Sequence, residues 1–175
     1  GLERKRIERL SAYRNLCIYQ FGDLDSVDRV VMNDVDCSFD PAHAVEILEK
    51  SLDWDVFSFA SRDTGTGDEF YDRWATRRRA TDTWWDDKPY DTTGDNHVWT
   101  TGNGFVCYNP EGFKRGATFG YVNKRTKEHD SENVVVCENF RAFGLHKIGF
   151  DGRYNTMHER DKYWHEKHGS TTNNI

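Results

Sequence analysis

The sequence lacks a long hydrophobic run. No stretch approaches the roughly 18 apolar residues of a membrane-spanning helix, and no signal peptide is recognisable. The mean hydropathy of −0.89 is polar for a folded domain, yet clear short apolar runs exclude a disordered chain. The 175 residues suffice for one domain with its own hydrophobic core.

Basic charge and cysteine are also scarce. Thirty acidic residues against 24 lysines and arginines give a formal net charge of −6. This balance argues against a general nucleic-acid binder, because such proteins carry a basic surface. No two cysteines form a CxxC pair, so a zinc site is not expected. Three of the four lie in or beside apolar runs and are expected to be buried thiols, with one disulfide left open; the four are Cys17, Cys37, Cys107 and Cys137.

Several common catalytic and nucleotide-binding motifs are missing. The loop at 61–69 (SRDTGTGDE) contains glycines but no Gly-Lys-Ser/Thr, so it is not a phosphate-binding P-loop. The sequence has no GxGxxG, no HExxH, no nucleophile elbow and no visible repeat. Aromatic residues, by contrast, make up 14% of the chain. Aromatic rings stack on sugars and bases but also fill cores, so this content favours a carbohydrate ligand only mildly.

The hydrophobic pattern predicts a single α/β domain. An amphipathic helix is expected over residues 2–21, where apolar residues recur at intervals of three and four: Ile7, Leu10, Tyr13, Cys17 and Phe21. A short strand follows at 30–32, and Asp40-Pro41 is typical of the N-cap and first residue of a second helix. A further strand at 55–59 completes a β-α-β series.

The second half of the chain has weaker signals. The apolar stretch 98–108 contains Gly102-Asn103-Gly104, which indicates a bulge or a close approach of the backbone to a ligand. The apolar run 134–138 ends at the carboxylate of Glu138, and a short helix is expected at 141–145. A last strand is expected at 147–150. The domain is expected to span 1–165, and 166–175 to form a flexible tail.

The most informative stretch is Val30-Val31-Met32-Asn33-Asp34-Val35-Asp36, where an apolar run ends in two carboxylates. Ligands of open α/β sheets gather at the carboxyl ends of such strands. Two adjacent carboxylates repel each other unless a cation lies between them or one of them is protonated. The D-x-D pattern therefore indicates a Mg²⁺ or Mn²⁺ site for a diphosphate, with a solvated strand end as the alternative.

Two stretches that contain arginine are further candidates for a binding site. Arg14 and Asn15 lie close to the apolar stripe of the first helix, so at least one of them is expected to face a cleft; the alternative is a salt bridge on the helix surface. Arg77-Arg78-Arg79 could hold a phosphate, but a solvated charge run is the favoured interpretation.

Taken together, these motifs resemble the GT-A glycosyltransferases. Arg6 through Arg14-Asn15 is similar to the "R…ARN" helix of that fold, and Asn33-Asp34-Val35-Asp36 to its metal motif. A narrower resemblance is to cryptococcal-type capsular mannosyltransferases and related viral and bacterial proteins. It rests on the order of Asn33-Asp34-Val35, Tyr71-Asp72-Arg73-Trp74-Ala75-Thr76-Arg77, Asn103-Gly104 and Cys137-Glu138.

The resemblance implies a GT-A-like, Rossmann-like mixed sheet flanked by helices, with the N-terminal strand or strands that hold the base missing from this chain. It implies a Mn²⁺ or Mg²⁺ cofactor, a UDP- or GDP-sugar donor and a glycan acceptor. Asp34, Asp36 and His158 would hold the metal, and Arg14, Asn15, Asp34 and Trp74 the donor. Asp72 and Trp74 would line the sugar or acceptor pocket. Glu138 would act as general base on the acceptor hydroxyl or orient it, and the alternative for Glu138 is a salt bridge with an arginine such as Arg141.

Two other functions remain open from the sequence. A non-catalytic carbohydrate- or nucleotide-binding remnant of the same fold would keep the ligand site without transferring sugar. A metal-dependent phosphoesterase would use the same paired carboxylates, but the additional clustered ligands of a two-metal site are not apparent. The chain begins without Met inside an expected helix, which indicates a fragment. The fragment alone favours the cytoplasm, and an upstream anchor would fit the Golgi lumen.

Overall fold

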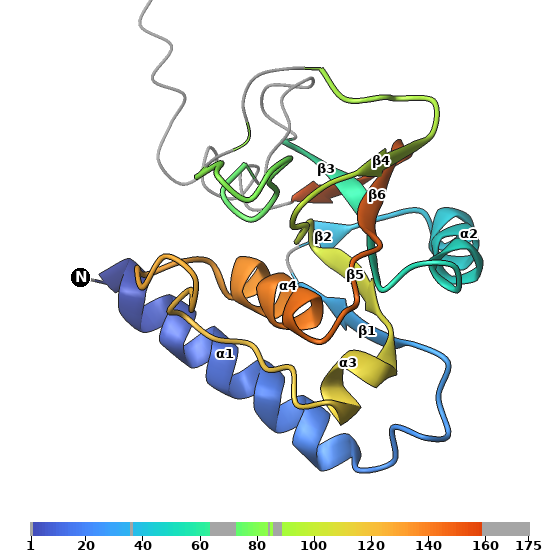
Figure 1. Cartoon of the computed structure of the whole chain (residues 1–175). Coiled ribbons are helices and arrows are strands. Elements are labelled where there is room, and N and C mark those ends of the chain that lie inside the picture. The colour runs from blue at the N-terminus through green and yellow to red at the C-terminus, as the bar shows by residue number, and fades with distance from the viewer. Residues whose placement is uncertain (1, 36, 64–72, 84, 86–88, 159–175) are drawn as a thin grey trace, which may run out of the picture.

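A computed structural model describes residues 2–35, 37–63, 73–83, 85 and 89–158. Its core is a six-stranded mixed sheet with the order β1-β5-β3-β6-β2, and β4 also pairs with β6. Figure 1 shows the sheet running through the molecule with helices on both faces. The elements are α1 (Leu2–Phe21), β1 (Val30–Asn33), β2 (Cys37–Ser38), α2 (Pro41–Ser51), β3 (Val56–Asp63), β4 (Asp95–His97), β5 (Phe105–Tyr108), α3 (Pro110–Lys114), α4 (Glu132–Ala142) and β6 (Ile148–His158).

The strand directions make the sheet mixed. β5 is antiparallel to both of its neighbours, β1 and β3, whereas β3 and β6 run parallel. Short β2 and β4 pair antiparallel with the two ends of β6. The predicted α/β class, with a mixed sheet flanked by helices, is therefore confirmed.

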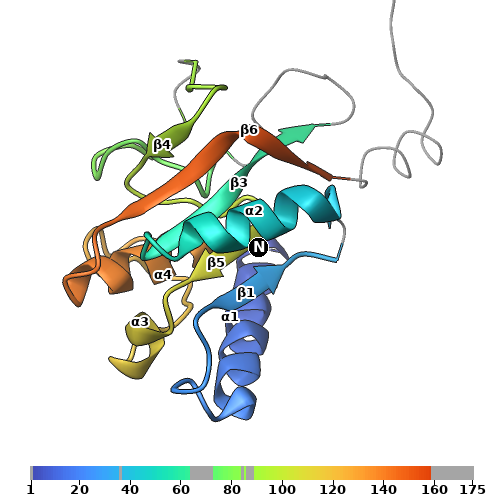
Figure 2. The ribbon, with the colours of Figure 1, turned by 90° about the vertical axis from the view of Figure 1, so that its right-hand side faces the viewer.

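The first half of the chain folds as its local signals predict. Asp40 caps α2 by accepting a hydrogen bond from the Ala42 N–H (2.8 Å), and Pro41 opens the helix. Ile47 of α2 is fully buried and belongs to the hydrophobic cluster on that face of the sheet, which also includes Phe57 and Phe59. Figure 2 shows α2 on one side of the sheet and α1 and α4 on the other.

Helix α1 has the predicted bounds, but the predicted apolar stripe is right only at its start, where Ile7 is buried. Tyr13 and Phe21 are exposed, as is Leu16 between them. The helix faces the protein with Ile7 and Ser11, which are buried, and with the half-buried Arg14. Specific polar contacts, described below, therefore hold α1 in place as much as apolar burial does.

Two predicted bounds in the second half are also wrong. The run 134–138 belongs to a helix, α4, which starts at Glu132 rather than at residue 141. Every residue from 132 to 137 is buried, so the run has no polar face and its helical period is hidden. The last strand, β6, does not end at residue 150 but continues to His158.

Other predictions have mixed outcomes. In the part of the chain that the structure describes, no helix is both long enough and apolar enough to cross a membrane. The four cysteines are free thiols; Cys107 and Cys137 are buried, while Cys17 is exposed. The loop expected at 61–69 is wrong at its start, because residues 61–63 belong to β3. Its remaining residues, 64–69, and the tail at 166–175 lie outside the described residues.

Candidate functional site

The D-x-D turn begins where β1 ends. The Asp34 N–H donates to the Gly104 carbonyl (2.7 Å), and the Asp34 carbonyl accepts from the Cys37 N–H (3.1 Å). Gly104 has a positive φ of 76°, and a Cβ there would lie 2.5 Å from the Cys37 Sγ. The sequence around Asn103-Gly104 predicts a bulge or a close approach of the backbone to a ligand. In the structure the backbone at Gly104 closely approaches the D-x-D turn of the protein itself.

Arg14 joins α1 to this turn. Its guanidinium donates to the Asp34 Oδ1 (2.6 Å) and to the Asn133 Oδ1 (2.7 Å), and it lies 3.4 Å from the Glu132 Oε1. Its side chain is only 12% exposed. The prediction that at least one of Arg14 and Asn15 faces inward is therefore confirmed. Arg14 forms salt bridges with other elements, and one of its partners is the first aspartate of the D-x-D pattern.

Asp34 keeps an accessible oxygen. Its side chain is 37% exposed, and among the described residues only Oδ1 receives a hydrogen bond. A carboxylate oxygen at a strand end, held from the other side by an arginine, fits the oxygen ligands that Mg²⁺ and Mn²⁺ prefer.

Glu132 and Asn133 were missed by the sequence reasoning. Both lie in the first turn of α4, where Ser131 is the N-cap and accepts from the Asn133 N–H (3.3 Å). Burial raises the pKa of Tyr108 well above its ordinary value, so its hydroxyl stays protonated and donates to the Asn133 Oδ1 (3.5 Å). The cap residue ahead of an apolar run was the signal that could have revealed this helix start.

The side chain of Asn15, predicted to bind the donor, forms hydrogen bonds with the protein backbone instead. Its Oδ1 accepts from the Phe119 N–H (2.9 Å) and its Nδ2 donates to the Phe119 carbonyl (3.0 Å). The Arg14 guanidinium also lies 5.5 Å from the centre of the Phe119 ring. Asn15 therefore fixes the loop before α4 against α1, which holds Arg14 in position.

The end of β6 returns to the D-x-D turn. His158 is the register partner of Cys37 in β2, and Met157 is the partner of Ser38. A late histidine is thus placed beside the strand that directly follows the motif. Asp36 and the side chain of His158 lie outside the described residues; among those described, no three Asp, Glu, His or Cys side chains are grouped to hold a metal ion.

Glu138 lies two turns further along α4. Its Oε1 accepts from the Trp99 Nε1 (2.9 Å) and from the Arg125 Nε (3.1 Å). The contact with Arg125 is a salt bridge, so the alternative expected for Glu138, a salt bridge with an arginine, is confirmed. The partner is not Arg141, which donates to backbone carbonyls of residues 98 and 99. Glu138 follows Glu132 by six positions in the helix, so the two residues lie about 9 Å apart along the helix axis.

Trp74 lines a small pocket of about 140 Å³, here called the Trp74 pocket, together with Arg77, Asp82, Arg125, His129 and Asp130 among others. Arg77 is only 3% exposed and both of its terminal nitrogens bind Asp130, so its prediction as a solvated charge is wrong. Asp72, predicted to share this region, lies outside the described residues.

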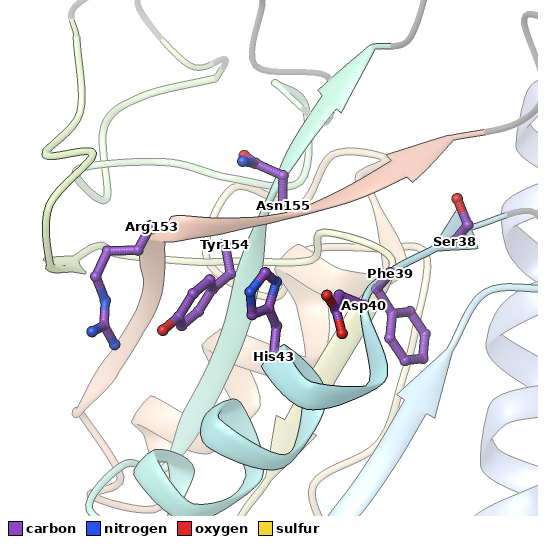
Figure 3. A pocket seen from close by; sticks show the side chains of 7 residues that line it. All are labelled: Ser38, Phe39, Asp40, His43, Arg153, Tyr154 and Asn155. Atoms are coloured by element: carbon purple, nitrogen blue, oxygen red, sulfur yellow. The ribbon is translucent and has the colours of Figure 1, made fainter.

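A second, more open pocket of about 320 Å³ lies between β6 and the start of α2 (Figure 3). His43 stacks on Tyr154 with 4.2 Å between the ring centres, and the two rings lie side by side in Figure 3. Two of its polar side chains are used within the protein, since Arg153 binds Asp151 and Tyr154 donates to Glu46. The Oδ1 of Asn155, in contrast, is buried and has no hydrogen-bond partner among the described residues.

Arg14, Asp34, Glu132 and Asn133 form one polar cluster, called here the D-x-D cluster. It joins a cation to an accessible carboxylate oxygen at the start of α4, where the helix dipole favours negative charge. No protein-family model matches this sequence, and no curated protein matches it significantly.

Proposed function

We propose that this domain is a metal-dependent glycosyltransferase of the GT-A type, which uses a nucleotide-sugar donor. The observation that carries the proposal is the convergence of three distant segments on the D-x-D turn. Arg14 arrives from α1, Glu132 and Asn133 from α4, and the end of β6 from the last strand. The resemblance in sequence rested in part on D-x-D and on the helix that carries Arg14, and it implied a late histidine as a further metal ligand.

The residues at the turn have separable roles in this proposal. Asp34 and Asp36, with His158 from β6, would hold Mn²⁺ or Mg²⁺. A metal held there would neutralise charge on the diphosphate leaving group. Arg14 orients the Asp34 carboxylate and adds a fixed positive charge beside the diphosphate. Glu132 holds Arg14 from the opposite side of its guanidinium.

The group that activates the acceptor hydroxyl is proposed to be Glu138. The hydrogen bonds from Trp99 and Arg125 hold its Oε1, and among the described residues its Oε2 accepts none. An oriented carboxylate with one uncommitted oxygen suits a general base. A Glu138→Gln variant should bind nucleoside diphosphate normally and lose transfer, whereas Glu132→Gln should weaken nucleoside diphosphate binding because it disturbs Arg14.

The direct test is calorimetry of UDP and GDP binding, with Mn²⁺ and with chelator. We expect one nucleotide to bind only with metal, and Asp36→Asn or Asp34→Asn to weaken that binding at least tenfold. Asp53→Asn is the matched control, because Asp53 is an exposed carboxylate remote in sequence from the turn. Metal-dependent binding that survives in the Asp34 and Asp36 variants would refute the site.

Transfer activity separates this proposal from its closest alternative. Release of nucleoside diphosphate in the presence of a glycan acceptor supports a transferase. Tight, metal-dependent binding without any turnover of donor would instead identify a binding remnant of the fold.

A further inference from the structure

The Trp74 pocket has the features of a site for a small, uncharged ligand. Two segments form it, residues 74–83 and 125–130. Its volume of about 140 Å³ lies well below the range of about 300–1,000 Å³ typical of sites for drug-sized ligands. A single sugar ring is therefore a better fit than a whole nucleotide.

The charges of the pocket argue against an anion. Arg77 is neutralised by Asp130, to which it donates two hydrogen bonds, and Arg125 is neutralised by Glu138. Asp82 and Glu128 add two more carboxylates to the lining. Phosphate recognition needs uncompensated cations, so this pocket does not suit a phosphate.

The lining instead combines an aromatic face with hydrogen-bonding groups. The Trp74 and His129 rings are nearly parallel, 23° apart, with 6.5 Å between their centres. Aromatic faces pack against the C–H face of a sugar, while carboxylates and hydroxyls bind its alcohol groups. The hydroxyls available in the lining are those of Thr81, Thr83 and Thr126.

One buried donor in the lining has no partner. The Arg77 Nε is buried, and it makes no hydrogen bond although both terminal nitrogens do. Buried donors are nearly always paired, and an unpaired one costs about 1–3 kcal/mol. A ligand hydroxyl in the pocket would supply the missing acceptor.

Two connections place the pocket next to the D-x-D cluster. The Thr76 hydroxyl donates to Asn103 (2.9 Å), and the next residue, Gly104, accepts from the Asp34 N–H. Independently, Asp130 of the lining directly precedes Ser131, the N-cap of α4, whose first turn contacts Arg14. The pocket and the D-x-D cluster thus share the start of α4.

We propose that the Trp74 pocket binds one neutral pyranose ring, either the sugar of the donor or the terminal sugar of the acceptor. This inference rests on the proposed function and deepens it. Glu138 then also acts as a positioning residue, because it holds Arg125 in the pocket wall, where Arg125 also donates to the Ala80 carbonyl.

The test compares Trp74→Leu with Tyr19→Leu, which removes an exposed aromatic ring from α1 outside the pocket. The probes are UDP-glucose, GDP-mannose, UDP, GDP, and free glucose, mannose and galactose. We expect Trp74→Leu to weaken the part of the binding that depends on the sugar about tenfold. A tenfold loss of affinity corresponds to the upper end of the energy of one aromatic contact. Binding of UDP and GDP alone should not change, and Tyr19→Leu should change neither.

The two sources of the sugar give different outcomes. If the pocket holds the donor sugar, Trp74→Leu removes the affinity difference between nucleotide-sugar and nucleotide. If it holds the acceptor sugar, Trp74→Leu weakens binding of a free sugar, measured by saturation-transfer NMR. Unchanged sugar binding in a folded Trp74→Leu protein overturns the inference, while metal-dependent nucleotide binding by that variant leaves the proposed function standing.

Discussion

At the scale of single residues, Arg14 has the most partners of the candidate site. It bridges the carboxylates of Asp34 and Glu132 and the amide of Asn133, although α1 and α4 are 119 residues apart at this contact. A lysine would keep the charge but could not reach three partners with a planar fork of donors. Arg14 therefore sets both the local stability and the orientation of Asp34.

We expect Arg14→Ala to lower the free energy of unfolding by about 3 kcal/mol, because it leaves the buried Glu132 carboxylate without its cation. Arg14→Lys should recover part of that loss but not the nucleotide affinity. Urea denaturation measures the first quantity and calorimetry the second. Arg9→Ala, an exposed arginine of the same helix, should stay within about 0.5 kcal/mol of the original protein; an equal loss there would mean that the helix itself is fragile.

At the scale of elements, the start of α4 links stability to the site. Ser131 caps this helix, and the two residues that contact Arg14 follow directly. Loss of a cap lets the first helical turn fray, and here that turn carries Glu132 and Asn133. A defect at this cap should therefore reach the D-x-D cluster.

We expect Ser131→Ala to cost about 1 kcal/mol of unfolding free energy and also to weaken metal-dependent nucleotide binding. Asp40→Ala is the matched control, because it removes the cap of α2 on the opposite face of the sheet. It should cost a similar amount of stability and leave nucleotide binding intact. Equal effects of both variants on binding would show that stability alone, and not the position of the α4 start, controls the ligand site.

The elements also show what the sequence could and could not predict. α1, β1, α2 and β3 were predictable because each has a local signal: a periodic pattern, an apolar run or a cap with proline. α4 was not, because its Val134-Val135-Val136 run is buried on every side and has no polar face. Asp34 and Arg14 were both found, but their contacts with Glu132 and Asn133, and the pairing of Arg77 with Asp130, join residues far apart in sequence.

At the scale of the whole molecule, an ion cluster outside the candidate site joins three elements. Lys50 of α2 binds Asp95 of β4 and Asp151 of β6, and Arg153 also binds Asp151. Burial alone would raise the pKa of Asp151, but the hydrogen bonds from Arg153 and Lys50 outweigh it, so its pKa lies below its usual value. Burial alone would lower the pKa of Lys50, but its bonds to Asp151 and Asp95 raise it above its usual value.

These two shifts define the pH range in which the cluster stabilises the fold. The lowered pKa of Asp151 means that its contribution is present above the unfolded value of 3.8 and is lost as pH falls through the folded value. The raised pKa of Lys50 means that its contribution is present below 10.5 and is lost as pH rises through the folded value. The cluster therefore contributes fully from about pH 4 to about pH 10.

We expect Lys50→Met to cost about 2 kcal/mol at pH 7, because two charged hydrogen bonds are lost. The difference from the original protein should shrink as pH is lowered below 4, where protonation of Asp151 removes the same interaction from both proteins. Thermal unfolding followed by circular dichroism between pH 7 and pH 2.5 measures this difference, with the exposed Lys5→Met as control. A difference that stays constant into acid would mean that the Lys50 ammonium stabilises the molecule through its contact with the Phe57 ring and not through Asp151.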